Sequence, residues 1–112
     1  MERGEIWWAS LPDPRGSEPG FRRPVVIVQT DEFTRSRIGT VLVAALTSNQ
    51  RLAEAPGNFL VRRRASGLSR DSVVNAARIL TLDERFLTER SGRLGAKQME
   101  LLDEGLRLVL SV

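Results

Sequence analysis

The stretch Phe21-Arg22-Arg23-Pro24-Val25-Val26-Ile27-Val28 joins a pair of arginines to a run of β-branched residues. A continuous apolar run of this kind predicts a buried strand, which we place at residues 23–29. Pro24 has a fixed φ and keeps the preceding residue out of the helical region, so Arg23 is held at a rigid start of the strand. A cation held there loses little freedom when an anion binds. The alternative is that Arg23 is an ordinary solvent-exposed arginine at the end of a strand, because the sequence Arg23-Pro24 would then be the same.

A second apolar segment, residues 40–46, leads directly into Thr47-Ser48-Asn49. We predict a strand here as well. Hydroxyl and amide groups are neutral hydrogen-bond donors. The first strand carries a cation at its end and the second is followed by such donors, and together these groups provide what a phosphate site requires. The same three residue types favour turns, and a plain turn is the alternative.

Composition restricts the chemistry that is available to this chain. It has 112 residues, of which 41% are apolar and 28% are charged, as in an ordinary single globular domain. There is no cysteine and no histidine, which excludes a disulfide framework and argues against a zinc site and against imidazole acid–base catalysis. We therefore expect no metal and no cofactor. Any catalysis has to use arginines, hydroxyl groups and carboxylates.

The sequence also suggests where the protein works. No apolar run approaches the ~18 residues that a membrane-spanning helix needs. A strand-like segment follows Met1 almost at once. We expect a cytoplasmic protein with no signal peptide and no membrane partner.

Sixteen arginines and one lysine, Lys97, contribute to a net charge of +3. The first 70 residues carry eleven arginines against seven acids, a balance of +4, whereas residues 71–112 carry six bases against seven acids, a balance of −1. The guanidinium fork binds phosphate in a bidentate manner, so a nucleic-acid partner is reasonable. An arginine-rich genome would explain the same composition.

Alternation, β-branched content and turn residues predict six short strands, at residues 5–10, 23–29, 40–46, 59–61, 72–75 and 78–82. Helical turns are expected at residues 30–33 and 83–86, the second capped by Asp83, and loops at residues 11–20 and 48–58. Because no long helix separates successive strands, the predicted fold class is α+β. We expect a small, strongly bent antiparallel barrel or sheet with short helices and a C-terminal helix.

The predicted C-terminal helix begins near Leu94 and has an apolar stripe on one face, made of Met99, Leu102, Leu106, Val109 and Leu110. Leu101 and Leu108 lie off this stripe and would be exposed to solvent in a monomer. They suggest a second buried face and hence a homodimer. Scattered surface leucines are the alternative.

Four further groups of residues could contribute to a site. Trp7 and Trp8 point to opposite faces of a strand, so one is expected in the core and the other in an interface or stacked on a base. Glu18 could hold an arginine or accept a proton, although loop acids are usually only solvated. Arg70-Asp71-Ser72 could form a polar wall. Arg62-Arg63-Arg64 could follow a nucleic acid, although such a run is more often a charged edge that prevents strand pairing.

In their order along the chain, these motifs resemble those of the MazF/PemK toxins of bacterial toxin–antitoxin modules. The resemblance covers nearly the whole chain. It rests on Arg3-Gly4-Glu5-Ile6-Trp7-Trp8, Gly16-Ser17-Glu18, Arg22-Arg23-Pro24-Val25, Leu46-Thr47-Ser48-Asn49, Pro56-Gly57-Asn58, Arg70-Asp71-Ser72-Val73-Val74-Asn75 and Leu102-Asp103-Glu104-Gly105-Leu106.

The resemblance implies a barrel similar to SH3 folds, a homodimer, and a metal-independent endoribonuclease that cuts single-stranded mRNA at short sequences. It also implies a cognate antitoxin whose extended acidic segment occupies the RNA groove. The catalytic arginine and threonine of the family fall on Arg23 and Thr47. The RNA contacts that we predict are Ser17, Glu18, Asp71 and Ser72 from the family's loop and strand motifs, Arg22, Ser48 and Asn49 beside the strand ends, and Arg78 near the base-reading groove.

Cleavage of this kind can proceed without histidine or metal, because RNA supplies its own nucleophile, the 2′-hydroxyl. The products would be a 2′,3′-cyclic phosphate and a 5′-hydroxyl. Arg23 would neutralise the transition state, and Thr47 would donate a hydrogen bond to a non-bridging oxygen. A guanidinium stays protonated at neutral pH, so the general base is left open between Glu18 and the phosphate itself.

Two other functions fit the same fold. A gyrase-poisoning toxin of the CcdB type would bind a protein through an exposed end of its C-terminal helix and would cut nothing. The short apolar terminus Leu110-Ser111-Val112 argues weakly against it. A non-catalytic barrel that binds RNA or protein is the third hypothesis. The sequence leaves open the RNA recognition sequence, the identity of the antitoxin, the trigger of toxin release, and whether Arg62-Arg63-Arg64 contact RNA.

Overall fold

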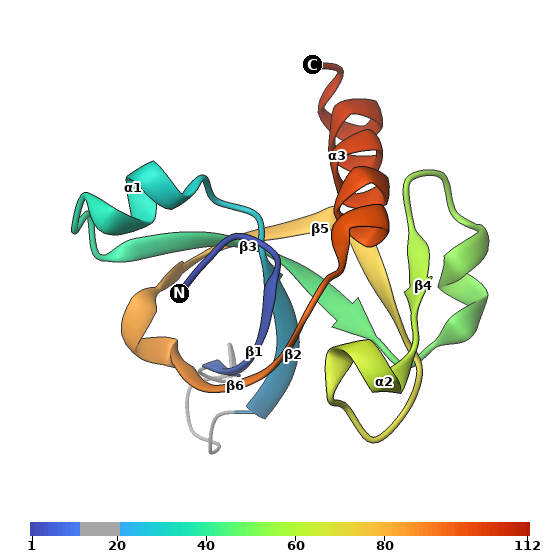
Figure 1. The fold of residues 1–112 in the computed structure, drawn as a ribbon, viewed down its shortest axis with the longest axis horizontal. Coiled ribbons are helices and arrows are strands. Elements are labelled where there is room, and N and C mark those ends of the chain that lie inside the picture. Colours follow the sequence, from blue (N-terminus) through green and yellow to red (C-terminus); the bar gives the residue numbers. More distant parts are fainter. Residues whose placement is uncertain (12–20) are drawn as a thin grey trace.

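One curled antiparallel sheet connects the parts of the molecule that the structure describes (Figure 1). The computed structural model describes residues 1–11 and 21–112. Within them, the strands lie in the order β4-β5-β3-β2-β1-β6. Their bounds are β1 Glu5–Leu11, β2 Phe21–Ile27, β3 Thr40–Thr47, β4 Phe59–Val61, β5 Ser72–Asp83 and β6 Leu87–Arg93.

Short helices lie between the strands, and one longer helix follows them. Two of the short ones are 3₁₀-helices that begin at a side-chain cap, because Asn49 accepts a hydrogen bond from the Arg51 amide at 3.2 Å and Asp83 accepts one from the Arg85 amide at 3.1 Å. The predicted cap at Asp83 is therefore confirmed. The helices are α1 Asp31–Arg35, η1 Gln50–Glu54, α2 Arg63–Ser66, η2 Glu84–Phe86 and α3 Ala96–Leu110.

The predicted α+β class with a strongly bent antiparallel sheet is confirmed, and several element predictions need correction. The strand predicted at 23–29 runs from Phe21 to Ile27. The loop predicted at 48–58 contains η1, and the triple arginine leads into α2. Strand β6 was not predicted, because its sequence LTERSGR has almost no apolar alternation.

The two strands predicted at 72–75 and 78–82 are one strand, β5. Its pairing with β3 shifts between two neighbours: Ala45 pairs with Asn75, whereas Ala44 pairs with Ile79. Residues 76–78 are therefore extra residues on the β5 side, as in a β-bulge. The bulge interrupts the sequence pattern without ending the strand, which explains the false break in the prediction.

The curled sheet buries side chains on both of its faces. Val26 of β2 belongs to one apolar cluster, and Val25 and Ile27 belong to the other. This explains why the apolar run of β2 is continuous rather than alternating. Trp8 packs against the first cluster and Trp7 against the second, so the predicted opposite orientation of the two tryptophans is confirmed.

Helix α3 uses only part of its predicted apolar stripe. Leu102 is fully buried, whereas Val109 and Leu110 near the end of the helix are exposed. Figure 1 shows the reason: the C-terminal part of α3 projects beyond the sheet. Leu101 and Leu108 are exposed, as expected for positions off the stripe. Among the helices that the structure describes, none is long and apolar enough to cross a membrane.

Gly105 lets α3 approach the turn before β4. A Cβ atom at this position would collide with the carbonyl oxygen of Gly57 and would lie 3.2 Å from the Cβ of Ala76. Gly57 itself has a φ of +86°, which a side chain would strain. The pair of glycines thus allows backbone-to-backbone packing between the helix and the turn.

We expect Gly105→Ala to destabilise the protein, although alanine is the better helix former by about 1 kcal/mol. Crowding against the Gly57 carbonyl costs more, and the net loss in unfolding free energy should be about 1–3 kcal/mol. Urea denaturation measures this. Glu104→Ala, at the exposed neighbouring position, is the control and should change stability by no more than about 0.5 kcal/mol. A stabilised Gly105→Ala variant would contradict the close packing.

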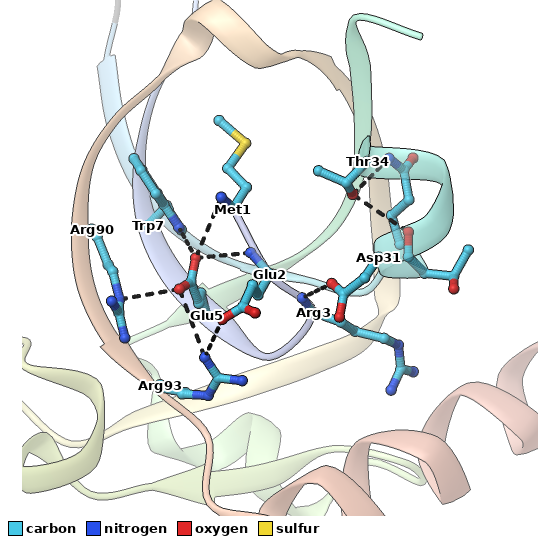
Figure 2. Close-up of polar contacts among 11 residues, drawn as sticks. Met1, Glu2, Arg3, Glu5, Trp7, Asp31, Thr34, Arg90 and Arg93 are labelled. Carbon is cyan, nitrogen blue, oxygen red and sulfur yellow. Dashed lines mark hydrogen bonds and ion pairs between the residues drawn. The ribbon is translucent and has the colours of Figure 1, made fainter. Parts of the chain in front are cut away.

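The carboxylate of Glu5 is buried at the junction of β1 and β6 (Figure 2). It accepts hydrogen bonds from the amide of Glu2 at 2.9 Å and from the indole of Trp7 at 3.1 Å. Arg90 and Arg93 of β6 lie 3.4 and 3.8 Å from its other oxygen. Burial by itself would raise the pKa of Glu5, but these hydrogen bonds, Arg90 and the N-terminal amine together hold that pKa below its ordinary value.

We expect Glu5→Gln to lower the unfolding free energy at pH 7 by about 2–3 kcal/mol, because charge-assisted hydrogen bonds to a buried carboxylate are lost. A lowered pKa means that the ionised form stabilises the fold above the ordinary value of 4.5 and that this contribution disappears as the pH falls through the lowered pKa. The difference between wild type and variant should therefore shrink in acid. Urea denaturation at several pH values tests this, with the more exposed Glu2→Gln as the control. A difference that stays constant down to low pH would refute it.

Candidate active site

A cleft of ≈ 550 Å³ opens where β2 begins, β3 ends and β5 begins. Its walls combine side chains from these strand ends with others from β1 and from the segment after α2. The residues that line it are Trp8, Phe21, Arg22, Arg23, Pro24, Leu46, Thr47, Ser48, Leu68, Ser69, Arg70 and Ser72. Five of the predicted site residues are among them: Arg22, Arg23, Thr47, Ser48 and Ser72.

The pairing of β2 with β3 explains why Arg23 and Thr47 line one cleft. Val25 pairs with Ala45 in an antiparallel register. Strand β2 begins and strand β3 ends just beyond this pair, so Arg23 and Thr47 lie at the same end of the sheet, where both line the cleft. The two residues that were predicted to be catalytic therefore line one cleft.

The pairing of β3 with β5 brings the hydroxyls to the same place. Thr47 pairs with Val73, the chain neighbour of Ser72, and Ser48 and Ser72 both line the cleft. Ser72 is buried, and its hydroxyl donates to the carbonyl of Arg70 at 3.3 Å. The amide of Asn49 donates to Thr47 Oγ1 at 3.2 Å, which leaves the hydroxyl proton of Thr47 available for another acceptor.

Arg22 is held in place by two neighbours. Its guanidinium carbon lies 4.7 Å from the centre of the Trp8 ring, and its Nη2 atom lies 3.1 Å from a carboxylate oxygen of Glu89. Glu89 lies on β6, the strand without a sequence signal, and so was not among the predicted site residues.

The cleft is positively charged. Among the described residues that line it, three are arginines and none is a carboxylate. Arg22 has Glu89 as an ion-pair partner, whereas Arg23 and Arg70 have none among the described acids. Arg23 instead lies with its guanidinium carbon 5.2 Å from the ring centre of Phe21. Such a surface attracts polyanions.

Three predicted RNA contacts do not line the cleft. Asn49 caps η1, and Arg78 is an exposed residue of the β5 bulge. Asp71 accepts hydrogen bonds from the backbone amide of Arg63 at 2.8 Å and from the side chain of Arg62 at 3.2 Å. The hydrogen bond from the Arg63 amide, followed by that from the Arg62 side chain, keeps the pKa of Asp71 below its ordinary value. The predicted contacts Ser17 and Glu18 lie outside the described residues.

Comparison with known proteins assigns the chain to a family. A family model described as "PemK-like, MazF-like toxin of type II toxin-antitoxin system" matches residues 2–110. The chain is 46% identical to endoribonuclease MazF6 of Mycobacterium tuberculosis over 112 residues, which cover 100% of this chain and 98% of the relative. It is 33% identical to endoribonuclease EndoA of Bacillus subtilis, with 100% and 96% covered. The chain therefore belongs to the MazF/PemK family of toxins of type II toxin–antitoxin systems.

Solved structures confirm the fold. A mycobacterial endoribonuclease in complex with its cognate antitoxin superposes with a TM-score of 0.80 at 22% sequence identity, covering 100% of this chain and 96% of that one. The Mycobacterium tuberculosis toxin MazF-mt6 gives a TM-score of 0.77 at 25% identity, with 96% and 97% covered. The predicted relationship to MazF toxins thus holds for the sequence and for the fold.

Proposed function

We propose that this protein is an endoribonuclease toxin that cleaves single-stranded RNA at short specific sequences without a metal ion, and that a cognate antitoxin neutralises it. The observation that carries the proposal is that Arg23 and Thr47 line the same positively charged cleft. The sequence identity to proteins named endoribonuclease supports the same function.

The reaction that suits this site uses the 2′-hydroxyl of the RNA as the nucleophile. The 2′-oxygen attacks the adjacent phosphorus, and the bond from phosphorus to the 5′-oxygen of the next nucleotide breaks. The 2′-hydroxyl gives up one proton and the leaving 5′-oxygen gains one, which leaves a 2′,3′-cyclic phosphate and a 5′-hydroxyl. The general base stays open between Glu18 and the phosphate.

The cleft residues match the charge that develops in this reaction. Negative charge accumulates on the non-bridging oxygens as the fifth bond to phosphorus forms, and a preorganised cation and donor stabilise it. Arg23 supplies the cation, because a guanidinium stays protonated at neutral pH and cannot serve as the base. Thr47 supplies the donor, since its oxygen already accepts the Asn49 amide and its proton is available.

The same cleft provides a rationale for neutralisation by an antitoxin. Arg23 and Arg70 lack carboxylate partners among the described residues, so an extended acidic segment could pair with them and exclude RNA. A similar toxin has been solved in complex with its cognate antitoxin. We further propose that the protein acts as a homodimer in the cytoplasm, with the exposed leucines Leu101 and Leu108 available for contact.

We expect Arg23→Ala to lower the cleavage rate at saturating RNA by on the order of 10²–10³, and Thr47→Val to lower it by a similar or smaller factor, because each removes one transition-state interaction. Both variants should keep the melting temperature of the wild type. The measurement is cleavage of a long defined RNA in excess EDTA, with mapping of the ends. Arg35→Ala, on the exposed surface of α1, is the charge-matched control and should cut like wild type.

A folded wild type that leaves the RNA intact would overturn the proposed function, and a DNA supercoiling assay would then test gyrase poisoning. Cutting that needs a divalent ion would refute the metal-free reaction. Products that end in a 3′-hydroxyl would exclude attack by the 2′-hydroxyl.

A further inference from the structure

Arg70 faces the cleft from the wall opposite to Arg22 and Arg23. It belongs to the segment between α2 and β5, whereas the other two arginines start β2. Strand β3 lies between β5 and β2 in the sheet. With about 5 Å between neighbouring strands, the two walls start roughly 10 Å apart. The side chain of Arg70 is exposed and has no ion-pair partner among the described acids.

The residue after Arg70 is turned away from the cleft. Arg70 and Ser72 line the cleft, but Asp71 between them does not. Its two carboxylate oxygens accept from the backbone amide of Arg63 and from the side chain of Arg62, at the start of α2. Asp71 therefore ties the beginning of α2 to the beginning of β5, and the chain between these points carries Arg70.

The other end of α2 is anchored as well. The carbonyl of Ser66 accepts a hydrogen bond from the Ser91 hydroxyl of β6 at 2.8 Å. Gly67 ends the helix with a φ of +72°, and a Cβ atom there would collide with the Ser91 carbonyl. The segment 67–71 is thus held at both ends, so Arg70 is presented from a fixed wall and not from a loose tail.

We propose that Arg70 is a further RNA-binding residue that holds a phosphate other than the scissile one, and that Asp71 is a positioning residue that keeps Arg70 at the cleft. The inference rests on the proposed function. It reassigns the role of Asp71, which the family resemblance implied to be an RNA contact: its oxygens bind the protein, and the neighbouring arginine contacts the ligand. Arg70 thereby fixes the register of the RNA strand across the cleft, while Arg23 and Thr47 act on the scissile phosphate.

Separate measurements of RNA binding and of the cleavage rate test the role of Arg70. The probe is a single-stranded RNA with the mapped cut sequence, either unmodified for kinetics or with a 2′-O-methyl group on every ribose for binding, since that group blocks the nucleophile. Arg70→Ala should raise Kd and KM by on the order of tenfold, as expected for one charge-assisted contact. The kcat should stay within about threefold of wild type, in contrast to the loss in Arg23→Ala.

The salt dependence gives an independent readout. Loss of one phosphate contact on a single strand should reduce the slope of log Kd against log salt concentration by about 0.7. Arg35→Ala removes the same charge from α1, which lies far from α2 in Figure 1, and should leave the slope unchanged. A wild-type slope and Kd in Arg70→Ala would overturn the proposal. So would a large drop in kcat, which would place Arg70 on the scissile phosphate.

A double-mutant cycle tests the role of Asp71. If Asp71 acts through Arg70, Asp71→Ala should weaken binding less than Arg70→Ala does, and the double variant should bind no more weakly than Arg70→Ala. Asp71→Asn keeps one oxygen as an acceptor for the Arg63 amide and should recover part of the affinity. Additive losses would show that Asp71 contacts RNA itself and would refute the positioning role. Thermal unfolding of each variant separates a local effect from loss of the fold.

The outcomes for this inference and for the proposed function are distinguishable. If wild type binds the methylated RNA but does not cut the unmodified one, the proposed function fails, while the binding and salt data still decide the role of Arg70. If wild type cuts and Arg70→Ala binds and cuts like it, only the present inference fails. If wild type does not bind RNA, both fail together.

Discussion

The antiparallel pairing of β2, β3 and β5 is the constraint on which the site depends. Val25 opposite Ala45 and Thr47 opposite Val73 set a register that brings Arg23, Thr47, Ser48 and Ser72 to one end of the sheet, where they line the cleft. A slip of one residue would turn each side chain to the other face. Both faces of β2 pack into apolar clusters, with Val26 in one and Val25 and Ile27 in the other.

Ion pairs attach the elements that the apolar core holds only weakly. Strand β6 contributes few apolar side chains, and its attachment to β1 is supported by Arg90 and Arg93 around the buried Glu5. The same strand supplies Glu89, which holds Arg22 against Trp8. On the other side of the cleft, Asp71 ties α2 to β5. Arg23 and Arg70, which have no ion-pair partner among the described acids, line the cleft between these attachments.

Part of this arrangement could be read from local sequence, and part could not. The β-branched run after Pro24 specified a strand, and Asp83 specified a cap, because both depend on neighbouring residues alone. Strand β6 escaped prediction, since it is stabilised by hydrogen bonds to β1 and by distant charges rather than by apolar alternation. The bulge of β5 also depends on a partner: only the pairing of Ala44 with Ile79 shows that residues 76–78 are inserted into one strand.

Some residues of the candidate site could likewise be predicted from the sequence, and others could not. Arg23 and Thr47 could be named in advance, because their motifs match a family and because a cation and a hydroxyl at strand ends suit a phosphate. Which of the other polar residues share the cleft was decided by the tertiary structure: Arg70 lines it and Asp71 does not, although they are neighbours in the chain. Residue type and order specify strands, turns and the available chemistry. The direction of each side chain depends on strand register and on partners that lie far away in the sequence.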